Sequence, residues 1–364
     1  MTKIIKMPVT ENTHRITMVM AGDEEGGLEK HVIELSNGLA SRGYKVCVIA
    51  HEKYKDRLSQ SINFTPVDLS KSRRNPIALW QLFTAIKASQ PDILHVQANK
   101  AVAMVAPLLK WLKVPSVATL HGMKNALNAF KRFDRIIAVS EQVALQFGQQ
   151  QIIRIIHNGA KIENSVALCT SELYTSELSN RPNDQSMIQA IAIGRLVPVK
   201  GFDVLISAWE NIDAKLQIVG NGPEYAALQA QIQTLDLSDR IKLLGYRDDI
   251  AELIEQADVF IISSRQEGGP YTLVESLLMN TPVLATRVGM VPEILPSDLV
   301  CEPDSVSALH ALLQNKLQDI STLNEISQPL YQFAHTHLSF DAMLDKTIEV
   351  YRELIPTPAP ALKE

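Results

Sequence analysis

Short apolar, β-branched runs alternate with helical patterns along the chain, and this alternation constrains the fold more than any other feature of the sequence. Residues 16–20 have the composition of a buried strand, residues 28–40 place leucine and valine at helical spacing, and residues 45–49 predict the next strand. Gly43 ends the helix between them. Repeated strand–helix units of this kind predict an α/β fold in which helices cover both faces of a parallel sheet.

A polar segment interrupts the alternation once. Residues 164–187 are rich in Ser, Thr, Asn and Glu, and the strand–helix pattern then restarts at Ile188. A chain of 364 residues is also too long for one ordinary α/β core. We predict two Rossmann-like domains over residues 1–163 and 188–335, joined by a linker over 164–187 and followed by a C-terminal helical segment over 336–364. Open α/β sheets bind ligands outside the carboxyl ends of their strands, so the expected site is a cleft between the two sheets.

A glycine-rich turn at residues 263–275 follows a predicted buried strand and opens a predicted helix. Pro270 suits the first turn of a helix, since its missing N–H would be unpaired there. Gly268 and Gly269 let the backbone come close to a ligand. The N–H groups of Tyr271 and Thr272 would then face an anion at the helix N-terminus. This segment predicts a seat for a phosphate or diphosphate.

Charged side chains surround that turn. Glu267 precedes the helix and Glu275 lies inside it, and each carboxylate can accept hydrogen bonds from sugar hydroxyls. Arg195 and Lys200 lie on a strand-to-helix loop early in the second domain, where two cations can neutralise a diphosphate. The alternatives are a helix whose acidic residues complement its dipole, and a basic loop that is merely solvated.

These motifs resemble those of a known family. The spacing of Glu267 and Glu275 and the Gly-Arg…Lys-Gly element at 194–201 are similar to the signatures of the retaining GT-B glycosyltransferases of family 4, glycosyl transferases group 1. Further matching elements lie at 26–29, 121–122, 139–140, 157–159, 218–223 and 244–246. The resemblance implies a GT-B fold, with two Rossmann-like domains whose parallel sheets face each other across a cleft. It also implies that the C-terminal helix crosses back to the first domain.

The resemblance also implies roles for single residues. Glu267 would contact the hydroxyls of the donor sugar and Glu275 the ribose. Arg195 and Lys200 would hold the diphosphate and stabilise the departing nucleotide. His121 would contact the transferred sugar near the reaction centre. We therefore expect His121, Glu267, Arg195 and Lys200 to be the catalytic group.

The remaining expected donor contacts are mostly backbone. Gly26 and Gly27 would close over the phosphates and the acceptor, and the nucleobase would lie against Gly245, Tyr246 and Arg247. The donor-binding set is completed by Gly268, Gly269, Tyr271, Thr272 and Glu275. The resemblance implies a nucleotide diphosphate sugar as donor, with UDP the commonest nucleotide in the family.

No metal or other cofactor is expected. Asp248-Asp249 is not an Asp-x-Asp motif, and the histidines lack metal-ligand spacing. The first loop does not fit the Gly-x-Gly-x-x-Gly pattern of a dinucleotide oxidoreductase. Two alternatives stay open, a nucleotide-sugar epimerase of similar architecture and a non-catalytic nucleotide-sugar-binding protein.

The charge is divided unevenly between the two halves. Residues 1–165 hold 22 Lys and Arg against 13 Asp and Glu, a balance of +9, while residues 166–364 hold 13 against 27, a balance of −14. No apolar run is long enough to span a membrane or serve as a signal peptide, so we expect a cytoplasmic enzyme. Halves that attract each other would also explain the asymmetry. We favour the interpretation that the basic half faces a polyanion.

The basic half predicts peripheral docking on an anionic inner membrane, with no nucleic-acid partner. Its acceptor would then be a bacterial cell-surface glycan or glycolipid precursor, such as lipopolysaccharide core, O-antigen or capsule. The expected surface mixes cations with apolar side chains, at Lys71, Arg73 and Arg74, at Lys110 and Lys113 around Trp111, and at Lys124, Lys131 and Arg132 among Leu127, Phe130 and Phe133. The alternative is that Phe130 and Phe133 belong to the core and the lysines only solvate the surface.

Overall fold

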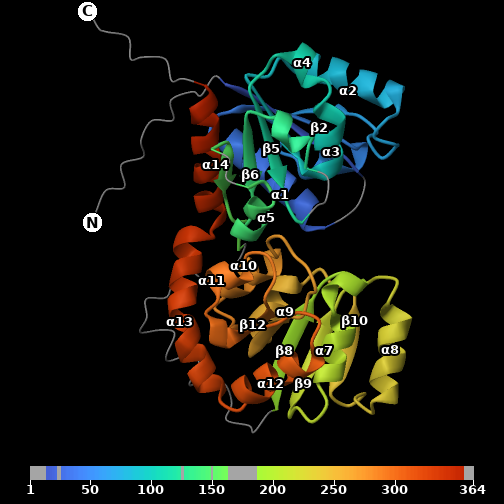
Figure 1. Cartoon of the computed structure of the whole chain (residues 1–364), viewed down its shortest axis with the longest axis vertical. Helices are drawn as coiled ribbons and strands as arrows, with labels where there is room; N and C mark the ends of the chain where they lie inside the picture. The colour runs from blue at the N-terminus through green and yellow to red at the C-terminus, as the bar shows by residue number, and fades with distance from the viewer. Residues whose placement is uncertain (1–13, 23–25, 124–126, 149–150, 163–186, 356–364) are drawn as a thin grey trace, which may run out of the picture. The chain divides into compact units, whose positions relative to one another are not determined.

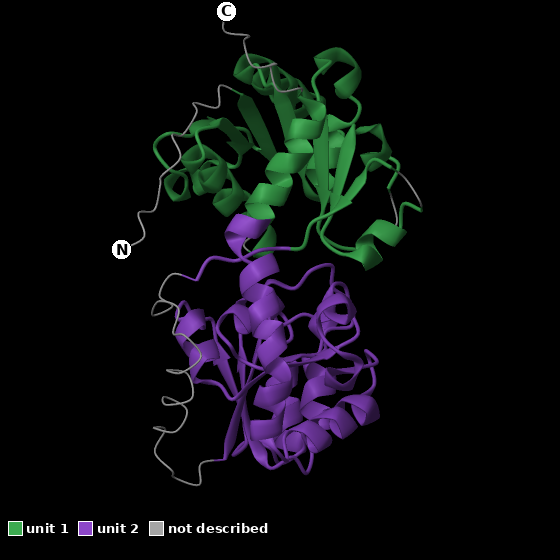
Figure 2. Ribbon diagram, turned by 90° about the vertical axis from the view of Figure 1, so that its left-hand side faces the viewer, with its two compact units in different colours: residues 1–157, 343–364 green, residues 158–342 purple. Residues whose placement is uncertain are grey.

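The computed structural model describes residues 14–22, 26–123, 127–148, 151–162 and 187–355. The chain folds into two compact units, each described here by itself (Figure 2). Unit 1 comprises residues 1–157 and 343–364, and unit 2 comprises residues 158–342. The predicted linker at 164–187 lies almost entirely outside the described residues.

Unit 1 is built on a seven-stranded parallel sheet with strand order β3-β2-β1-β4-β5-β6-β7 (Figure 1). Its inner strands are near-continuous apolar runs because helices cover both faces of the sheet. The strands are β1 (Arg15–Met20), β2 (Lys45–Ala50), β3 (Asn63–Pro66), β4 (Ile93–Gln97), β5 (Ser116–Leu120), β6 (Arg135–Ala138) and β7 (Ile153–Ile155). The helices are α1 (Gly27–Ser41), α2 (Pro76–Ser89), α3 (Ala98–Val105), α4 (Leu109–Leu112) and α5 (Glu141–Leu145), with short 3₁₀ turns η1 (Glu52–Arg57) and η2 (Phe130–Arg132).

Unit 2 repeats the design with a six-stranded parallel sheet of order β10-β9-β8-β11-β12-β13. The strands are β8 (Ile188–Ile193), β9 (Ala214–Val219), β10 (Ile241–Gly245), β11 (Val259–Ile262), β12 (Val283–Thr286) and β13 (Val300–Cys301). The helices are α7 (Phe202–Ala208), α8 (Tyr225–Thr234), α9 (Ile250–Gln256), α10 (Tyr271–Leu278), α11 (Val291–Ile294), α12 (Val306–Lys316), α13 (Ile320–His337) and the first three residues of α14 (Phe340–Leu354), with 3₁₀ turns η3 (Pro198–Lys200) and η4 (Ser297–Leu299). Two Rossmann-like domains of this kind confirm the predicted fold class.

Helix α14 begins in unit 2, but from Met343 onward it belongs to unit 1. Its buried face packs there through leucine, isoleucine and tyrosine side chains. Near its end, Glu353 accepts hydrogen bonds from Arg135 and Arg154 at 2.7 Å each. These arginines lie on β6 and β7, and together they hold the pKa of the Glu353 carboxyl below its usual range. Unit 1 is therefore assembled from both ends of the chain.

One expected surface is not exposed. Phe130 is fully buried and Phe133 is 3% exposed, so both belong to the core of unit 1. The prediction that they form part of a membrane-facing segment is wrong, although Lys131 and Arg132 beside them are exposed. Lys124 lies outside the described residues. Within the described residues, no helix is long and apolar enough to cross a bilayer.

Candidate functional site

Two loops of unit 2 bring predicted site residues together at the carboxyl ends of adjacent strands. Lys200 ends η3 after β8, and Glu267 lies in the loop after β11. The Lys200 Nζ atom donates to Glu267 Oε1 at 2.5 Å, and the Ser264 hydroxyl donates to the same oxygen at 2.8 Å. The two side chains are 25% and 16% exposed, so the ion pair is only partly screened by water. The residues assigned to the diphosphate and to the sugar therefore contact each other directly.

Glycines allow these loops to approach at backbone distance. Gly201 has a φ of +64°, and a Cβ there would lie 2.2 Å from the Ser263 carbonyl oxygen. A Cβ on Gly220, after β9, would lie 1.9 Å from the Gly194 carbonyl oxygen. Since any side chain at either position would collide with backbone, the loops after β8, β9 and β11 form one tightly packed rim.

An arginine that the sequence analysis did not assign ties this rim together. The guanidinium of Arg265 makes a two-pronged contact with Asp203, at 2.8 and 2.7 Å, and its Nε donates to Asp304 at 2.6 Å. It also donates to the carbonyl of Pro198 at 2.5 Å. The Arg265 hydrogen bond holds the pKa of the Asp203 carboxyl below its usual range. Arg265 therefore clamps the loop that carries Lys200 to the loop that carries Glu267.

The start of α10 is held from two sides. The Gly268 carbonyl accepts from the Met290 N–H at 3.0 Å, and the Gly269 carbonyl accepts from the Asn158 side-chain amide at 2.6 Å. Pro270 stands at the N-cap with an extended backbone, and α10 begins at Tyr271, where the helix was predicted to begin. Leu273 donates the first backbone bond, to Pro270, at 3.2 Å. The N–H groups of Tyr271 and Thr272 lie ahead of that bond, at the N-terminus of the helix.

The other donor residues of unit 2 lie on the same edge of the sheet. Glu275 is half-buried one turn into α10, and Arg195 is exposed on the loop after β8. Gly245 ends β10 with a φ of +69°, and Tyr246 beside it is 76% exposed. Arg247 pairs with Asp249, whose hydrogen bond raises the pKa of the guanidinium. The residues expected near the nucleobase thus lie at the carboxyl end of a strand two places from β8.

Gly26, Gly27 and His121 lie in unit 1. Gly26 precedes α1 and Gly27 begins it, and both are exposed. His121 follows β5, and its Nε2 lies 2.8 Å from the Gln97 Oε1 atom. Its ring stands edge-on to the His31 ring, with centroids 4.9 Å apart. Burial, with added repulsion from His31 and His95, lowers the pKa of His121 well below 6.5. The imidazole is therefore neutral at physiological pH.

Comparison with known proteins follows this division into two units. The model for Glycosyl transferases group 1 matches residues 178–331, and the model for Glycosyltransferase Family 4 matches residues 25–164. The chain belongs to this family of glycosyltransferases.

Relatives of this glycosyltransferase act on different acceptors. The phosphatidylinositol N-acetylglucosaminyltransferase GPI3 subunit of Saccharomyces cerevisiae is 23% identical over 91% of this chain and 81% of its own. The lipopolysaccharide core biosynthesis glycosyltransferase LpsE of Rhizobium meliloti is 26% identical over 72% and 76%. Anabaena HepE, solved with UDP-glucose, superposes with a TM-score of 0.78 at 21% identity over 93% of this chain and all of its own. The last likeness shows that the glycosyltransferase has the GT-B fold.

Two residues of the site escaped the sequence analysis as functional groups. Arg265 stood inside the glycine-rich segment, but its partners lie 62 and 39 residues away. Asn158 belonged to a matching motif without an assigned role. Its Oδ1 atom is buried and has no hydrogen-bond partner among the described residues. The signal for Asn158 was its place in that His-Asn-Gly motif, since the 111-residue separation from Gly269 leaves no local pattern.

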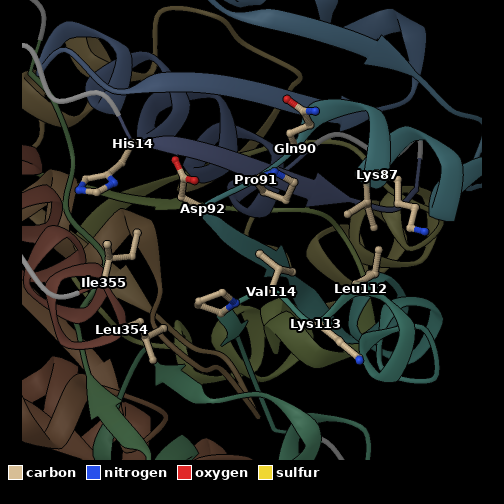
Figure 3. A pocket seen from close by; sticks show the side chains of 12 residues that line it. His14, Lys87, Gln90, Pro91, Asp92, Leu112, Lys113, Val114, Leu354 and Ile355 are labelled. Atoms are coloured by element: carbon tan, nitrogen blue, oxygen red, sulfur yellow. The ribbon is translucent and has the colours of Figure 1, made fainter.

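A cavity of unit 1 lies away from the predicted site. It measures about 540 Å³ and is lined by residues that precede strands, such as His14, Asp92 and Pro115, and by Leu354 and Ile355 (Figure 3). These residues mark the amino-terminal edge of the sheet, opposite the carboxyl ends where α/β proteins bind ligands.

Metal ligands do not gather in the described parts of the chain. No group of three or more His, Cys, Asp or Glu there has the spacing to hold an ion. The expectation of metal-independent transfer stays a prediction.

Proposed function

We propose that this glycosyltransferase moves a sugar from a UDP-linked donor to a hydroxyl of an anionic glycolipid precursor, with retention of anomeric configuration. The observation that carries the donor half is the cluster of Lys200, Glu267 and Ser264 beside the N-terminus of α10. A cation and helix N–H groups suit a diphosphate, and a half-buried carboxylate suits sugar hydroxyls.

In the proposed reaction, negative charge develops on the diphosphate, next to the cations and the helix N-terminus. As the bond between the anomeric carbon and the phosphate oxygen breaks, negative charge builds on the diphosphate, and Lys200, Arg195 and the helix N-terminus stabilise it. The acceptor oxygen attacks the same face, and its proton passes to the leaving phosphate oxygen. No metal ion takes part in this proposal. A trapped glycosyl adduct on a carboxylate of the protein would contradict it.

The donor proposal is tested by thermal shift with a panel of nucleotide sugars, followed by turnover. We expect UDP-sugars to raise the melting temperature by mass action, because they bind the native state. Nucleotide release should increase when an acceptor is added, and the product should keep the anomeric configuration of the donor by NMR. An isomerised sugar nucleotide without acceptor would instead favour an epimerase.

The acceptor half of the proposal rests on an exposed face of unit 1. Ile77 and Trp80 on α2 are each 66% exposed, and Trp111 on α4 is 56% exposed. The Lys110 ammonium lies 3.9 Å above the Trp111 ring centroid. Residues from the ends of α2 and α4, including Lys87, share the lining of one cavity, so the two helices are neighbours (Figure 1). Exposed tryptophans among lysines are what docking on an anionic membrane requires.

A second basic feature of unit 1 lies beside the carboxyl end of β4. A cavity of about 350 Å³ is lined by Lys71, Arg73 and Lys100 together with Ser70, Ser72 and Asn99. Three cations and no carboxylate in the lining favour an anionic group, such as a lipid-linked phosphate of the acceptor. The relatives that act on phosphatidylinositol and on lipopolysaccharide core support an acceptor of this class.

Liposome co-sedimentation tests the docking face. We expect binding to vesicles that contain anionic lipid, loss of binding in high salt, and weaker binding of the Trp80→Ser, Trp111→Ser double variant. Leu145→Ser is the matched control, because Leu145 is 77% exposed on α5 and is not part of the docking face. Absence of binding at low salt would leave a soluble acceptor as the better proposal.

A further inference from the structure

Strand β4 carries two polar side chains into the core of unit 1. His95 and Gln97 are both 0% exposed, and as alternate residues of a strand they point to the same face of the sheet. A buried polar side chain destabilises the fold unless its hydrogen bonds are satisfied. The hydrogen-bond partners of His95 and Gln97 therefore account for the presence of these side chains in the core.

The two side chains belong to one hydrogen-bonded chain that ends at His121. The His121 Nε2 atom lies 2.8 Å from Gln97 Oε1, and the Gln97 Nε2 atom lies 3.2 Å from His95 Nε2. On the far side, the His95 Nδ1 atom lies 2.6 Å from the Tyr351 hydroxyl. Tyr351 is 2% exposed and comes from α14, more than 250 residues along the chain. All four residues belong to unit 1.

The protons in this chain can be assigned from donors and acceptors. Burial lowers the pKa of His95 to about 3, so its ring is neutral and carries one N–H and one lone pair. The N–H₂ group of Gln97 can only donate, so the His95 Nε2 atom that it faces at 3.2 Å is the acceptor, and the Thr119 hydroxyl lies 2.6 Å from the same atom. The proton of His95 therefore sits on Nδ1 and is donated to the Tyr351 oxygen. The Tyr351 hydroxyl in turn points its proton toward the Met18 sulfur, 4.0 Å away.

The same reasoning fixes the tautomer of His121. Gln97 uses its N–H₂ group toward His95, so its oxygen faces His121 and accepts from that ring. His121 must then carry its proton on Nε2. This leaves Nδ1 with a lone pair that can accept a hydrogen bond from a hydroxyl group of a bound substrate.

We infer that Gln97, His95 and Tyr351 are positioning residues, which hold His121 as the Nε2–H tautomer with Nδ1 as an acceptor. The inference rests on the proposed function in one respect only, namely that His121 contacts the transferred sugar. Helix α14 then contributes to the reaction, because the Tyr351 hydroxyl at the far end of the hydrogen-bonded chain comes from that helix.

NMR of the ligand-free protein tests the tautomer without any assay of transfer. Long-range ¹H–¹⁵N spectra of the imidazoles, with His121 assigned by the loss of its signals in His121→Asn, should show a protonated Nε2 and an unprotonated Nδ1. Gln97→Met removes the acceptor and should give a mixture of tautomers. Gln97→Glu keeps an acceptor oxygen for His121 and should restore the Nε2–H form of that ring. An Nδ1–H tautomer in the wild type, or no change in Gln97→Met, would overturn the inference.

Kinetics then separate positioning from folding. We expect kcat to fall about fivefold to tenfold in Gln97→Met and in Tyr351→Phe, the size of effect that one lost hydrogen bond gives, with KM for the nucleotide sugar within about twofold. Tyr331→Phe, a buried tyrosine of α13 in unit 2, should leave kcat unchanged. Equal loss of kcat in all three tyrosine and glutamine variants would indicate general destabilisation and refute a positioning role. If the tautomers behave as expected while His121→Asn transfers normally, the proposed role of His121 fails and the hydrogen-bonded chain stands.

Discussion

The contact between Lys200 and Glu267 leads to a prediction about nucleotide binding. In the structure the Lys200 ammonium is already paired with the Glu267 carboxylate, at 2.5 Å. A diphosphate must compete with that carboxylate for the same cation. A charge-assisted hydrogen bond contributes about 1.5–3 kcal/mol when buried, and an exposed ion pair contributes about 0–1 kcal/mol. With side chains 25% and 16% exposed, we place this pair at about 1 kcal/mol.

Removal of the carboxylate charge should therefore release Lys200 for the nucleotide. In Glu267→Gln we expect UDP to bind as tightly as in the wild type or up to about fivefold tighter, since 1.4 kcal/mol corresponds to tenfold. The UDP-sugar should lose that advantage because its hydroxyls lose a charged acceptor, and transfer should be impaired. Lys200→Met should weaken both ligands by about tenfold to a hundredfold.

Isothermal titration of UDP and of the UDP-sugar into the wild type, the two single variants and the double variant measures these effects as a cycle. For UDP, the coupling energy of the cycle should show that Glu267→Gln tightens binding only when Lys200 is present. Equal weakening of UDP and UDP-sugar in Glu267→Gln would refute the assignment of Glu267 to the sugar.

Three further predictions follow from the geometry. The pKa of His31 is lowered to about 4 and that of His95 to about 3, below the unfolded value of 6.5. Acidification therefore favours the unfolded state. Between pH 7.5 and 5 the free energy of unfolding, measured by urea titration, should fall by about 2 kcal/mol for each ring. The fall should be smaller in His31→Gln, which lacks one of the two rings. Gly220→Ala should lower the melting temperature more than Gly245→Ala, since a Cβ at 245 meets nothing within 4 Å, and equal shifts would contradict this. Arg265→Lys loses the two-pronged contact with Asp203 and should weaken UDP binding severalfold, and unchanged affinity would show that the clamp is not needed.

Local periodicity was sufficient to predict the framework of both units. The pattern was predicted to restart at Ile188, where β8 begins, and the predicted strands at 16–20 and 45–49 differ from β1 and β2 by one residue each. Such runs are recognisable because a strand that helices cover on both faces is mostly apolar along its length. Glycine and proline likewise indicated the turn before α10, because they act through the backbone of their own position.

Features that depend on long-range contacts could not be predicted in this way. Phe130 begins a three-residue 3₁₀ turn and Phe133 follows it, and so short a segment has no period that distinguishes a core side chain from an exposed one. Arg265 and Asn158 act on residues between 39 and 111 positions away, and only the folded sheet brings them together. The pairing of Lys200 with Glu267 is of the same kind, with 67 residues between them.

The passage of α14 into unit 1 has a consequence for how the protein is made. By the time residue 157 has been synthesised, every strand of the first sheet exists, but the hydroxyl that pairs with His95 and the carboxylate that pairs with Arg135 and Arg154 are still almost two hundred residues away. The second sheet is complete before those groups leave the ribosome. During synthesis, the His95 ring therefore lacks the Tyr351 hydroxyl as a hydrogen-bond partner until α14 is made. Unit 1 can therefore form these hydrogen bonds only after α14 has been translated.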